Sequence, residues 1–122
     1  MTSTQIGIQT SIQTRIEGCA GCITLMRPQA LNALDHAMWL GIEEALDLWR
    51  EDDAVALIVI DAEGPRAFCA GGDIATLYHD GRAGIHDTGR DFWRDEYRLN
   101  AKLAEYPKPI VSFLHGFVTR VP

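Results

Sequence analysis

The chain has 122 residues, which is enough for one small domain and too few for a large multidomain enzyme. Hydrophobic residues make up 47% of it and charged residues 23%, an ordinary globular composition that argues against intrinsic disorder. The formal net charge of −6 disfavours nucleic acid as a partner, because proteins that bind nucleic acid concentrate positive charge. A small anionic ligand stays possible, since backbone amides at a helix N-terminus can hold one.

Nothing in the sequence predicts export or membrane insertion. The stretch Met1–Glu17 lacks the apolar core of a secretory signal, and the longest apolar run, Ala54–Ile60, is far too short to cross a bilayer. We therefore predict a cytoplasmic protein with no membrane partner. The odd number of cysteines, three, argues against a disulfide framework. Cys19 and Cys22 form a C-x-x-C pair, but no second ligand pair follows, so no metal site is predicted and the pair is interpreted as structural.

The first part of the chain predicts a hairpin followed by a helix. Evenly spaced isoleucines predict one strand within Gln5–Glu17, and the stretch Gly21–Met26 predicts a second strand after a turn at Glu17-Gly18. Asp35 is placed to cap a helix that continues to Glu51. Apolar residues recur along this helix at helical spacing and predict one buried stripe, made of Met38, Ile42, Ala45 or Leu46, and Trp49.

The rest of the chain alternates between strand and helix patterns. The continuous apolar run Ala54–Ile60 is too short and too β-branched for a buried helix, so it predicts a central strand covered on both faces. A second long helix is predicted over Asp91–Tyr106, because Pro107 follows it. Ile110–Leu114 then predicts another buried strand. Apolar strands that alternate with amphipathic helices predict an α/β fold.

A glycine-rich stretch, Ala70-Gly71-Gly72-Asp73, lies where a predicted strand passes into a helical pattern. Two consecutive glycines leave their backbone amides unshielded, and at a helix N-terminus such amides could hold an oxyanion formed in acyl chemistry. The alternative is a tight turn that uses glycine for its backbone angles and binds nothing, and spacing alone favours this alternative. The stretch matches neither of the common nucleotide phosphate loops.

Glu96 is the second candidate. On a helix it shares a face with Phe92, Leu99 and Leu103, and a carboxylate on an apolar stripe is either partnered or raised in pKa. An equally good stripe leaves Glu96 in solvent and buries instead Trp93, Tyr97, Asn100 and Ala104. Asp95 and Glu96 could also form ordinary surface pairs with Arg94 and Arg98. The pattern alone does not choose between these arrangements.

Other polar residues give weaker indications. The four histidines lack ligand spacing, so each is interpreted as a surface residue or a hydrogen-bonded core residue; they are His36, His79, His86 and His115. Cys69 has no identifiable basic partner that would activate it as a nucleophile, so it is predicted to be a buried apolar residue.

Several of these stretches together are similar to one family. The segments Ile23–Leu34 and Ala67–Ile74 resemble the enoyl-CoA hydratase/isomerase (crotonase) superfamily. Phe92–Asn100, followed by Tyr106–Ile110, is most similar to the 3-hydroxyisobutyryl-CoA hydrolase branch, whose members cleave an acyl-CoA thioester in valine breakdown. The resemblance covers Ile16–Gly116, most of the chain.

This resemblance implies an α/β fold of the crotonase-like ββα spiral type and an acyl-CoA substrate. Gly72 would supply one backbone N–H of an oxyanion hole, and Ala70 and Gly71 would line the same turn. Ala30 and Ala33 would border the CoA channel. No separate cofactor is implied, because CoA is part of the substrate.

The resemblance also assigns a role to the second candidate. Glu96 matches a substrate-contacting glutamate of the hydrolase branch, which favours the stripe that buries it.

The C-terminal stretch departs from the family pattern. After His115-Gly116 the family continues into a Met-Gly-Gly-Gly segment that supplies the second oxyanion donor, with acidic catalytic residues further on. This chain has Phe117–Pro122 there, without those glycines. We therefore predict that residues 16–122 form the N-terminal part of a crotonase-like domain, incomplete and inactive alone, and that residues 1–15 are an extension or the first strand.

Three other interpretations stay open. One is a hydratase or isomerase of the same superfamily. The others are non-catalytic: a fragment that binds acyl-CoA, or one that pairs with a complementing C-terminal chain. The candidate protein partners are thus that chain or a second copy.

Overall fold

The computed structural model describes residues 11–69, 82, 84 and 87–118. Its main sheet has four strands in the order β1-β2-β3-β5. β1 (Ile12–Glu17) and β2 (Ala20–Leu25) form an antiparallel hairpin, as the sequence predicted. β2 pairs in parallel with β3 (Leu57–Ala62), and β3 pairs in parallel with β5 (Ile110–Ser112). A separate two-stranded parallel sheet joins β4 (Ala67–Cys69) to β6 (Phe117–Val118).

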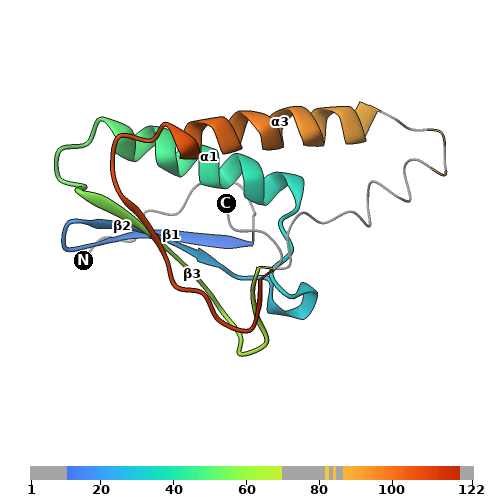
Figure 1. The fold of residues 1–122 in the computed structure, drawn as a ribbon, viewed down its shortest axis with the longest axis horizontal. Coiled ribbons are helices and arrows are strands. Elements are labelled where there is room, and N and C mark those ends of the chain that lie inside the picture. Colours follow the sequence, from blue (N-terminus) through green and yellow to red (C-terminus); the bar gives the residue numbers. More distant parts are fainter. Residues whose placement is uncertain (1–10, 70–81, 83, 85–86, 119–122) are drawn as a thin grey trace.

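Two helices lie on the same side of the main sheet. α1 (His36–Arg50) connects β2 to β3, and α3 (Asp87–Ala104) precedes β5. Figure 1 shows α1 between the sheet and α3, so that the helices form two successive layers. Asp35 caps α1 as predicted, because its carboxylate accepts a 2.9 Å hydrogen bond from the Met38 amide.

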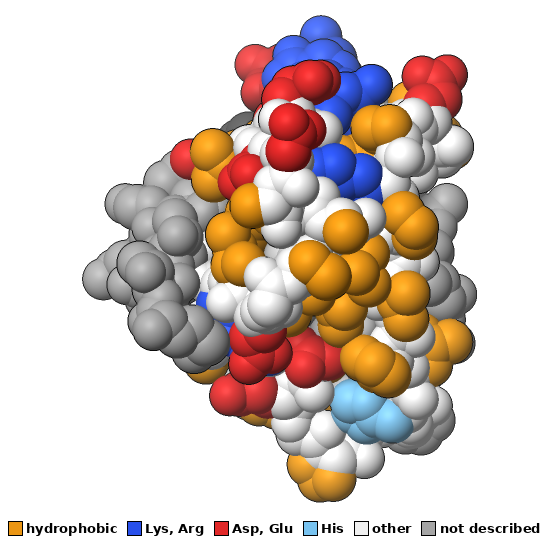
Figure 2. All heavy atoms as spheres, turned by 90° about the vertical axis from the view of Figure 1, so that its left-hand side faces the viewer, with side chains coloured by type: hydrophobic (Ala, Val, Ile, Leu, Met, Phe, Trp, Pro, Cys, Tyr) orange, Lys and Arg blue, Asp and Glu red, His pale blue; other side chains and the backbone are white. Residues whose placement is uncertain are grey.

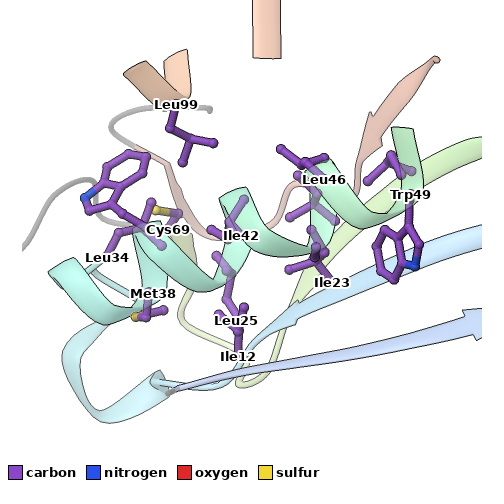
Figure 3. Packing of buried hydrophobic residues seen from close by; sticks show 14 of the residues in the cluster. Ile12, Ile23, Leu25, Leu34, Met38, Ile42, Leu46, Trp49, Cys69 and Leu99 are labelled. Carbon is purple, nitrogen blue, oxygen red and sulfur yellow. The ribbon is translucent and has the colours of Figure 1, made fainter. Parts of the chain in front are cut away.

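The core lies between α1 and the sheet. The predicted stripe of α1 is buried and packs on alternate side chains of β2 and β3; these residues are Met38, Ile42, Ala45, Leu46 and Trp49 on the helix, with Ile23, Leu25, Ile58 and Ile60 on the strands. Figure 3 shows how the side chains of α1 reach down toward Ile23, Leu25 and Ile12. A single apolar stripe on one helix thus covers three neighbouring strands.

Several boundaries differ from the predictions. β3 begins at Leu57 rather than Ala54, because its pairing with β2 starts where Ala20 lies opposite Leu57. The prediction that this strand is covered on both faces was wrong: Ile58 and Ile60 are buried, whereas Leu57 and Val59 are only half-buried. α3 begins at Asp87, earlier than predicted, and ends at Ala104.

The first strand also crosses a predicted boundary. β1 runs from Ile12 to Glu17, so residues on both sides of position 15 pair with β2 in one sheet. The remainder of the predicted first strand, residues 5–10, lies outside the described residues.

One contact in this core gives a direct test of the packing. Gly21 in β2 lies so close to the Trp49 ring that an added Cβ would collide with it. Trp49 is fully buried, and in a close-packed core such a ring cannot shift without displacing its neighbours. We expect Gly21→Ala to lower the free energy of unfolding by about 1–3 kcal/mol in urea denaturation.

Gly89→Ala is the matched control, because an added Cβ on this residue of α3 meets nothing within 4 Å. That variant should keep the stability of the original chain or raise it by about 0.5–1 kcal/mol, since alanine suits a helix better than glycine. An unchanged stability in Gly21→Ala would contradict the packing described here.

Candidate active site

β4 and β6 are the strands next to which, in the sequence, the resemblance places the two segments of the oxyanion hole. The strands are parallel, with Ala67 opposite Phe117 and Cys69 opposite Val118. The chain therefore leaves β4 after Cys69 at the same end at which it leaves β6 after Val118. The predicted site residues Ala70, Gly71 and Gly72 follow directly after Cys69 and lie outside the described residues.

The residues before β6 hold β4 in place. The amide of Phe68 donates a 2.8 Å hydrogen bond to the carbonyl of His115, and His115 Nε2 lies 2.7 Å from the carbonyl oxygen of Gly64. Gly116 has a φ of +59°, and an added Cβ there would collide with the carbonyl of Arg66. This close approach explains a glycine at position 116, since any side chain would push β6 away from β4.

The segment between β2 and α1 carries the predicted CoA-bordering residues. It begins with a 3-10 turn, η1 (Pro28–Ala30), and both Ala30 and Ala33 are half-buried. Leu31 and Asn32 have positive φ angles of 54° and 55°. The segment packs against the β3–β4 loop, where an added Cβ on Gly64 would lie only 2.7 Å from Pro28 Cβ.

Asn32 joins this segment to β4, and the sequence analysis did not identify it. Its side chain is almost completely buried and makes three hydrogen bonds. Asn32 Oδ1 accepts one from the Arg27 amide at 2.8 Å, and Nδ2 donates to the carbonyls of Glu63 and Ala67 at 2.8 and 2.9 Å. The signal in the sequence was an asparagine within a short loop, the residue other than glycine that most readily takes a left-handed conformation.

α3 places Glu96 on its buried face. Glu96 is 8% exposed and shares that face with the buried Phe92 and Leu99, whereas Trp93 and Tyr97 are 55% and 75% exposed. The interpretation that buries Glu96 is therefore confirmed, and the alternative stripe is wrong.

The buried face of α3 belongs to the same hydrophobic core as Leu34 and Cys69. Figure 3 shows Leu99 of α3 at the same end of the core as Leu34 and Cys69. Glu96 lies about one helical turn before Leu99, on the same buried face. The core thus links α3 to the segments that carry the other predicted site residues.

A ladder of charged side chains fixes α3 against α1. Arg98 binds Glu43 through two 2.8 Å contacts, and Lys102 binds Glu43 and Asp47, each at 2.9 Å. At the other end of the ladder, Asp95 lies 2.5 Å from His36 and 2.8 Å from Arg98. We call these six residues the α1–α3 ladder.

The electrostatics of the ladder follow from these contacts. Burial would raise the pKa of Asp95, but the hydrogen bond with His36 and the charges of Arg98 and Arg94 outweigh it and lower that pKa. For Glu43, the hydrogen bond from Arg98 has the largest effect and lowers the pKa, although burial opposes it. The sequence left open a surface pairing of Asp95 with Arg94 and Arg98. Both pairs form, but Asp95 is buried rather than at the surface.

The cysteines take no part in a disulfide. Cys69 is fully buried, as predicted, and Cys22 is buried while Cys19 is exposed. Burial is the largest influence on Cys22 and raises its pKa, although Arg15 acts in the opposite direction. Among the residues that the structure describes, no group of three or more His, Cys, Asp or Glu side chains could hold a metal ion. None of the helices in that part of the chain is long and apolar enough to cross a membrane.

Comparison with known proteins gives the relationship directly. The sequence profile described as enoyl-CoA hydratase/isomerase matches residues 20–119. The chain belongs to this family. Its α/β structure is that of the crotonase fold: it superimposes on an enoyl-CoA hydratase from Rhodobacter sphaeroides with a TM-score of 0.84 and 57% identity, and on a carnitinyl-CoA dehydratase from Mycobacterium thermoresistibile with a TM-score of 0.85 and 42% identity.

Each of these superpositions covers 88% of this chain and 32% of the other chain. Among curated proteins, a 3-hydroxyisobutyryl-CoA hydrolase of Xenopus tropicalis is 48% identical over 99 residues, and one of Rattus norvegicus is 44% identical over 99 residues. Both alignments cover 81% of this chain and 26% of the relative. The chain therefore spans about a quarter of the length of these curated relatives.

The ladder gives a prediction for stability against pH. Because the folded-state pKa values of Asp95 and Glu43 are lowered, their contribution is present above the unfolded values, about 3.9 for Asp and 4.3 for Glu, and is lost as pH falls through the folded values. Asp95→Asn and Glu43→Gln should each lower the free energy of unfolding by about 1–3 kcal/mol at pH 7. In urea denaturation, this difference from the original chain should shrink as pH falls below about 4.

Glu44→Gln is the control, because Glu44 is exposed on the same helix. It should alter stability by less than about 0.5 kcal/mol at either pH. A difference between Asp95→Asn and the original chain that stays constant from pH 7 to pH 3 would contradict the assignment of the ladder.

Proposed function

We propose that the chain forms the N-terminal part of an acyl-CoA thioester hydrolase of the 3-hydroxyisobutyryl-CoA hydrolase type. The burial of Glu96 carries this proposal, because the resemblance to the hydrolase branch assigns a substrate contact to that carboxylate. The names of the Xenopus tropicalis and Rattus norvegicus relatives support the same activity. We also propose a role in valine degradation and a cytoplasmic location, although both of those relatives are named as mitochondrial.

The proposed chemistry is electrostatic stabilisation of an oxyanion. When a nucleophile attacks a thioester, negative charge develops on the carbonyl oxygen, and two backbone N–H groups can hold it in a site from which water is excluded. Gly72 would donate one of them, with Ala70 and Gly71 beside it. The parallel pairing of β4 and β6 supports this role, because Cys69, which Ala70 follows in the sequence, lies opposite Val118. Ala30 and Ala33 would border the CoA part of the substrate.

This sequence differs from the family pattern in the segment that supplies the second oxyanion donor. The residues after Gly116 are Phe117–Pro122, and the three consecutive glycines of the family pattern are not among them. Side chains at these positions would crowd the oxyanion, and Pro122 has no N–H to donate. We therefore propose that the 122-residue chain alone releases no CoA from 3-hydroxyisobutyryl-CoA.

A chimera tests the proposal. In it, residues 20–116 of this chain replace the matching stretch of the Xenopus tropicalis hydrolase. The hydrolase's own sequence then follows directly after Gly116. The chimera should release CoA thiol from 3-hydroxyisobutyryl-CoA, measured with a thiol reagent. Gly72→Pro in the chimera should reduce turnover by about 10²–10³ or more, since it removes the N–H of one oxyanion donor.

Two controls accompany this measurement. A chimera that extends to Pro122, and so replaces the glycine segment with Phe117–Pro122, should be inactive if that segment supplies the second donor. Full activity in the Gly72→Pro chimera would refute the oxyanion role. Hydration of crotonyl-CoA without thiol release would favour a hydratase, the activity named for the Rhodobacter sphaeroides structure.

A second candidate function is a fragment that pairs with a complementing chain. Among the residues that the structure describes, β5 is one of the two edge strands of the main sheet, and Val111, Phe113 and Leu114, on and after it, are exposed. Figure 2 shows a face of the molecule on which hydrophobic side chains gather between charged groups. The curated relative from Xenopus tropicalis is about four times longer than the stretch that matches this chain. We propose that the remaining part of such a protein would cover the exposed edge at β5.

This candidate predicts complementation. Mixed with the part of the Xenopus tropicalis hydrolase that follows the matching stretch, the chain should co-elute with it in size-exclusion chromatography. Phe113→Asp should abolish co-elution, because it places a charge in the apolar contact. Leu48→Asp is the matched control, since Leu48 is 58% exposed on α1 and Phe113 is 60% exposed. A chain that elutes alone with and without the fragment would exclude this candidate.

A further inference from the structure

One peptide group in β4 is held from both sides. The carbonyl of Ala67 accepts a 2.9 Å hydrogen bond from Asn32 Nδ2, and the amide of Phe68 donates a 2.8 Å hydrogen bond to the carbonyl of His115. These two groups belong to the same peptide unit. Its plane is therefore fixed between the segment before α1 and the segment before β6, and the chain reaches Ala70 only two residues after Phe68.

Asn32 also fixes the loop on which it lies. Its Oδ1 accepts a hydrogen bond from the Arg27 amide, and its second Nδ2 hydrogen bonds the Glu63 carbonyl in the β3–β4 loop. This buried side chain thus connects its own loop to two distant backbone segments. They are the β3–β4 loop, reached at Glu63, and β4, reached at Ala67. Two of these segments are the predicted CoA-bordering segment and the strand that leads into the predicted oxyanion turn.

We propose that Asn32 is a positioning residue that sets the place of β4 relative to the CoA-bordering segment. The inference rests on the proposed function, because it gives the CoA-bordering segment and the residues that follow β4 their roles. A thioester held along residues 30–33 presents its carbonyl at a fixed point, and the donor after β4 must lie within hydrogen-bond distance of that point. Asn32 sets this spacing without contacting the substrate.

The chemistry of the site requires asparagine in particular. Glycine would accept the φ of 55° but would offer no side-chain hydrogen bonds. Aspartate has the same shape and could still accept from the Arg27 amide, but it could not donate to the carbonyls of Glu63 and Ala67. It would instead place negative charge against two carbonyl oxygens in a buried position. Asn32→Gly and Asn32→Asp therefore remove the hydrogen bonds to β4 without introducing a side chain that the backbone disfavours.

The first measurement is amide hydrogen exchange of the 122-residue chain. Asn32→Asp and Asn32→Gly should each speed exchange in the peptide that contains β4, whereas exchange in α1 should keep its rate. Gln29→Ala is the matched control, because Gln29 is exposed in the same segment, and it should leave exchange in β4 unchanged. Unchanged exchange in β4 of both Asn32 variants would overturn the proposal.

The second measurement separates positioning from simple loss of structure. In the chimera described above, Asn32→Asp should lower kcat for thioester hydrolysis by about tenfold or more, because a misplaced donor weakens stabilisation of the transition state. KM should stay within about twofold, since the CoA-bordering residues are still present. A raised KM with unchanged kcat, or the same kcat and KM as the unsubstituted chimera, would overturn the positioning role and leave the proposed function intact.

The unsubstituted chimera distinguishes the two levels of inference. If it releases no thiol from 3-hydroxyisobutyryl-CoA, the proposed function fails and the role of Asn32 fails with it. If it is active and only the Asn32 variants lose kcat, both are supported. Equal loss of kcat in Gln29→Ala would show that any change in the segment disturbs the site, which would also overturn a specific role for Asn32.

Discussion

The packing of α1 on the parallel strands is the contact on which the rest of the molecule depends. The buried stripe of this helix covers β2 and β3, and its other side receives α3. α3 in turn has its place only because α1 is fixed, since the main charged contacts of α3 are with Glu43, Asp47 and His36. Two interfaces therefore separate Glu96 from the sheet: one between the sheet and α1, and one between α1 and α3. Loss of the first interface would remove the second.

The two interfaces differ in kind, and this matters for the site. Between the sheet and α1 the contact is apolar, and the hydrophobic burial that stabilises it is not directional. Between α1 and α3 the ladder adds paired contacts of fixed spacing, among them the two-point contact of Arg98 with Glu43. Directional contacts of this type set the register of one helix against the other, and with it the depth at which Glu96 lies.

Local sequence pattern predicts much of the fold but less of the candidate site. The stripe of α1 and the cap at Asp35 were predictable because they depend on neighbours three or four residues away. The two candidate buried stripes of α3 match helical spacing equally well, because periodicity carries no information about the helix that packs against α3. The acidic residues Glu43 and Asp47 on α1 decide between them, since Arg98 and Lys102 must face those carboxylates. Asn32 was missed for a related reason: its three backbone partners are defined only by the folded arrangement of distant segments.

The pairing of β4 with β6 also has a consequence for the order in which the chain folds. Ala67 and Phe117 are fifty positions apart in sequence, whereas β1 and β2 are joined by a short turn. Closing a long loop costs more chain entropy than closing a hairpin, so distant pairs form late unless other contacts have already shortened the path. We expect the hairpin and α1 to form first, and the pairings of β3 with β5 and of β4 with β6, which join residues about fifty positions apart, to form later. The strands next to the segments assigned to chemistry thus belong to the late-forming part of the fold.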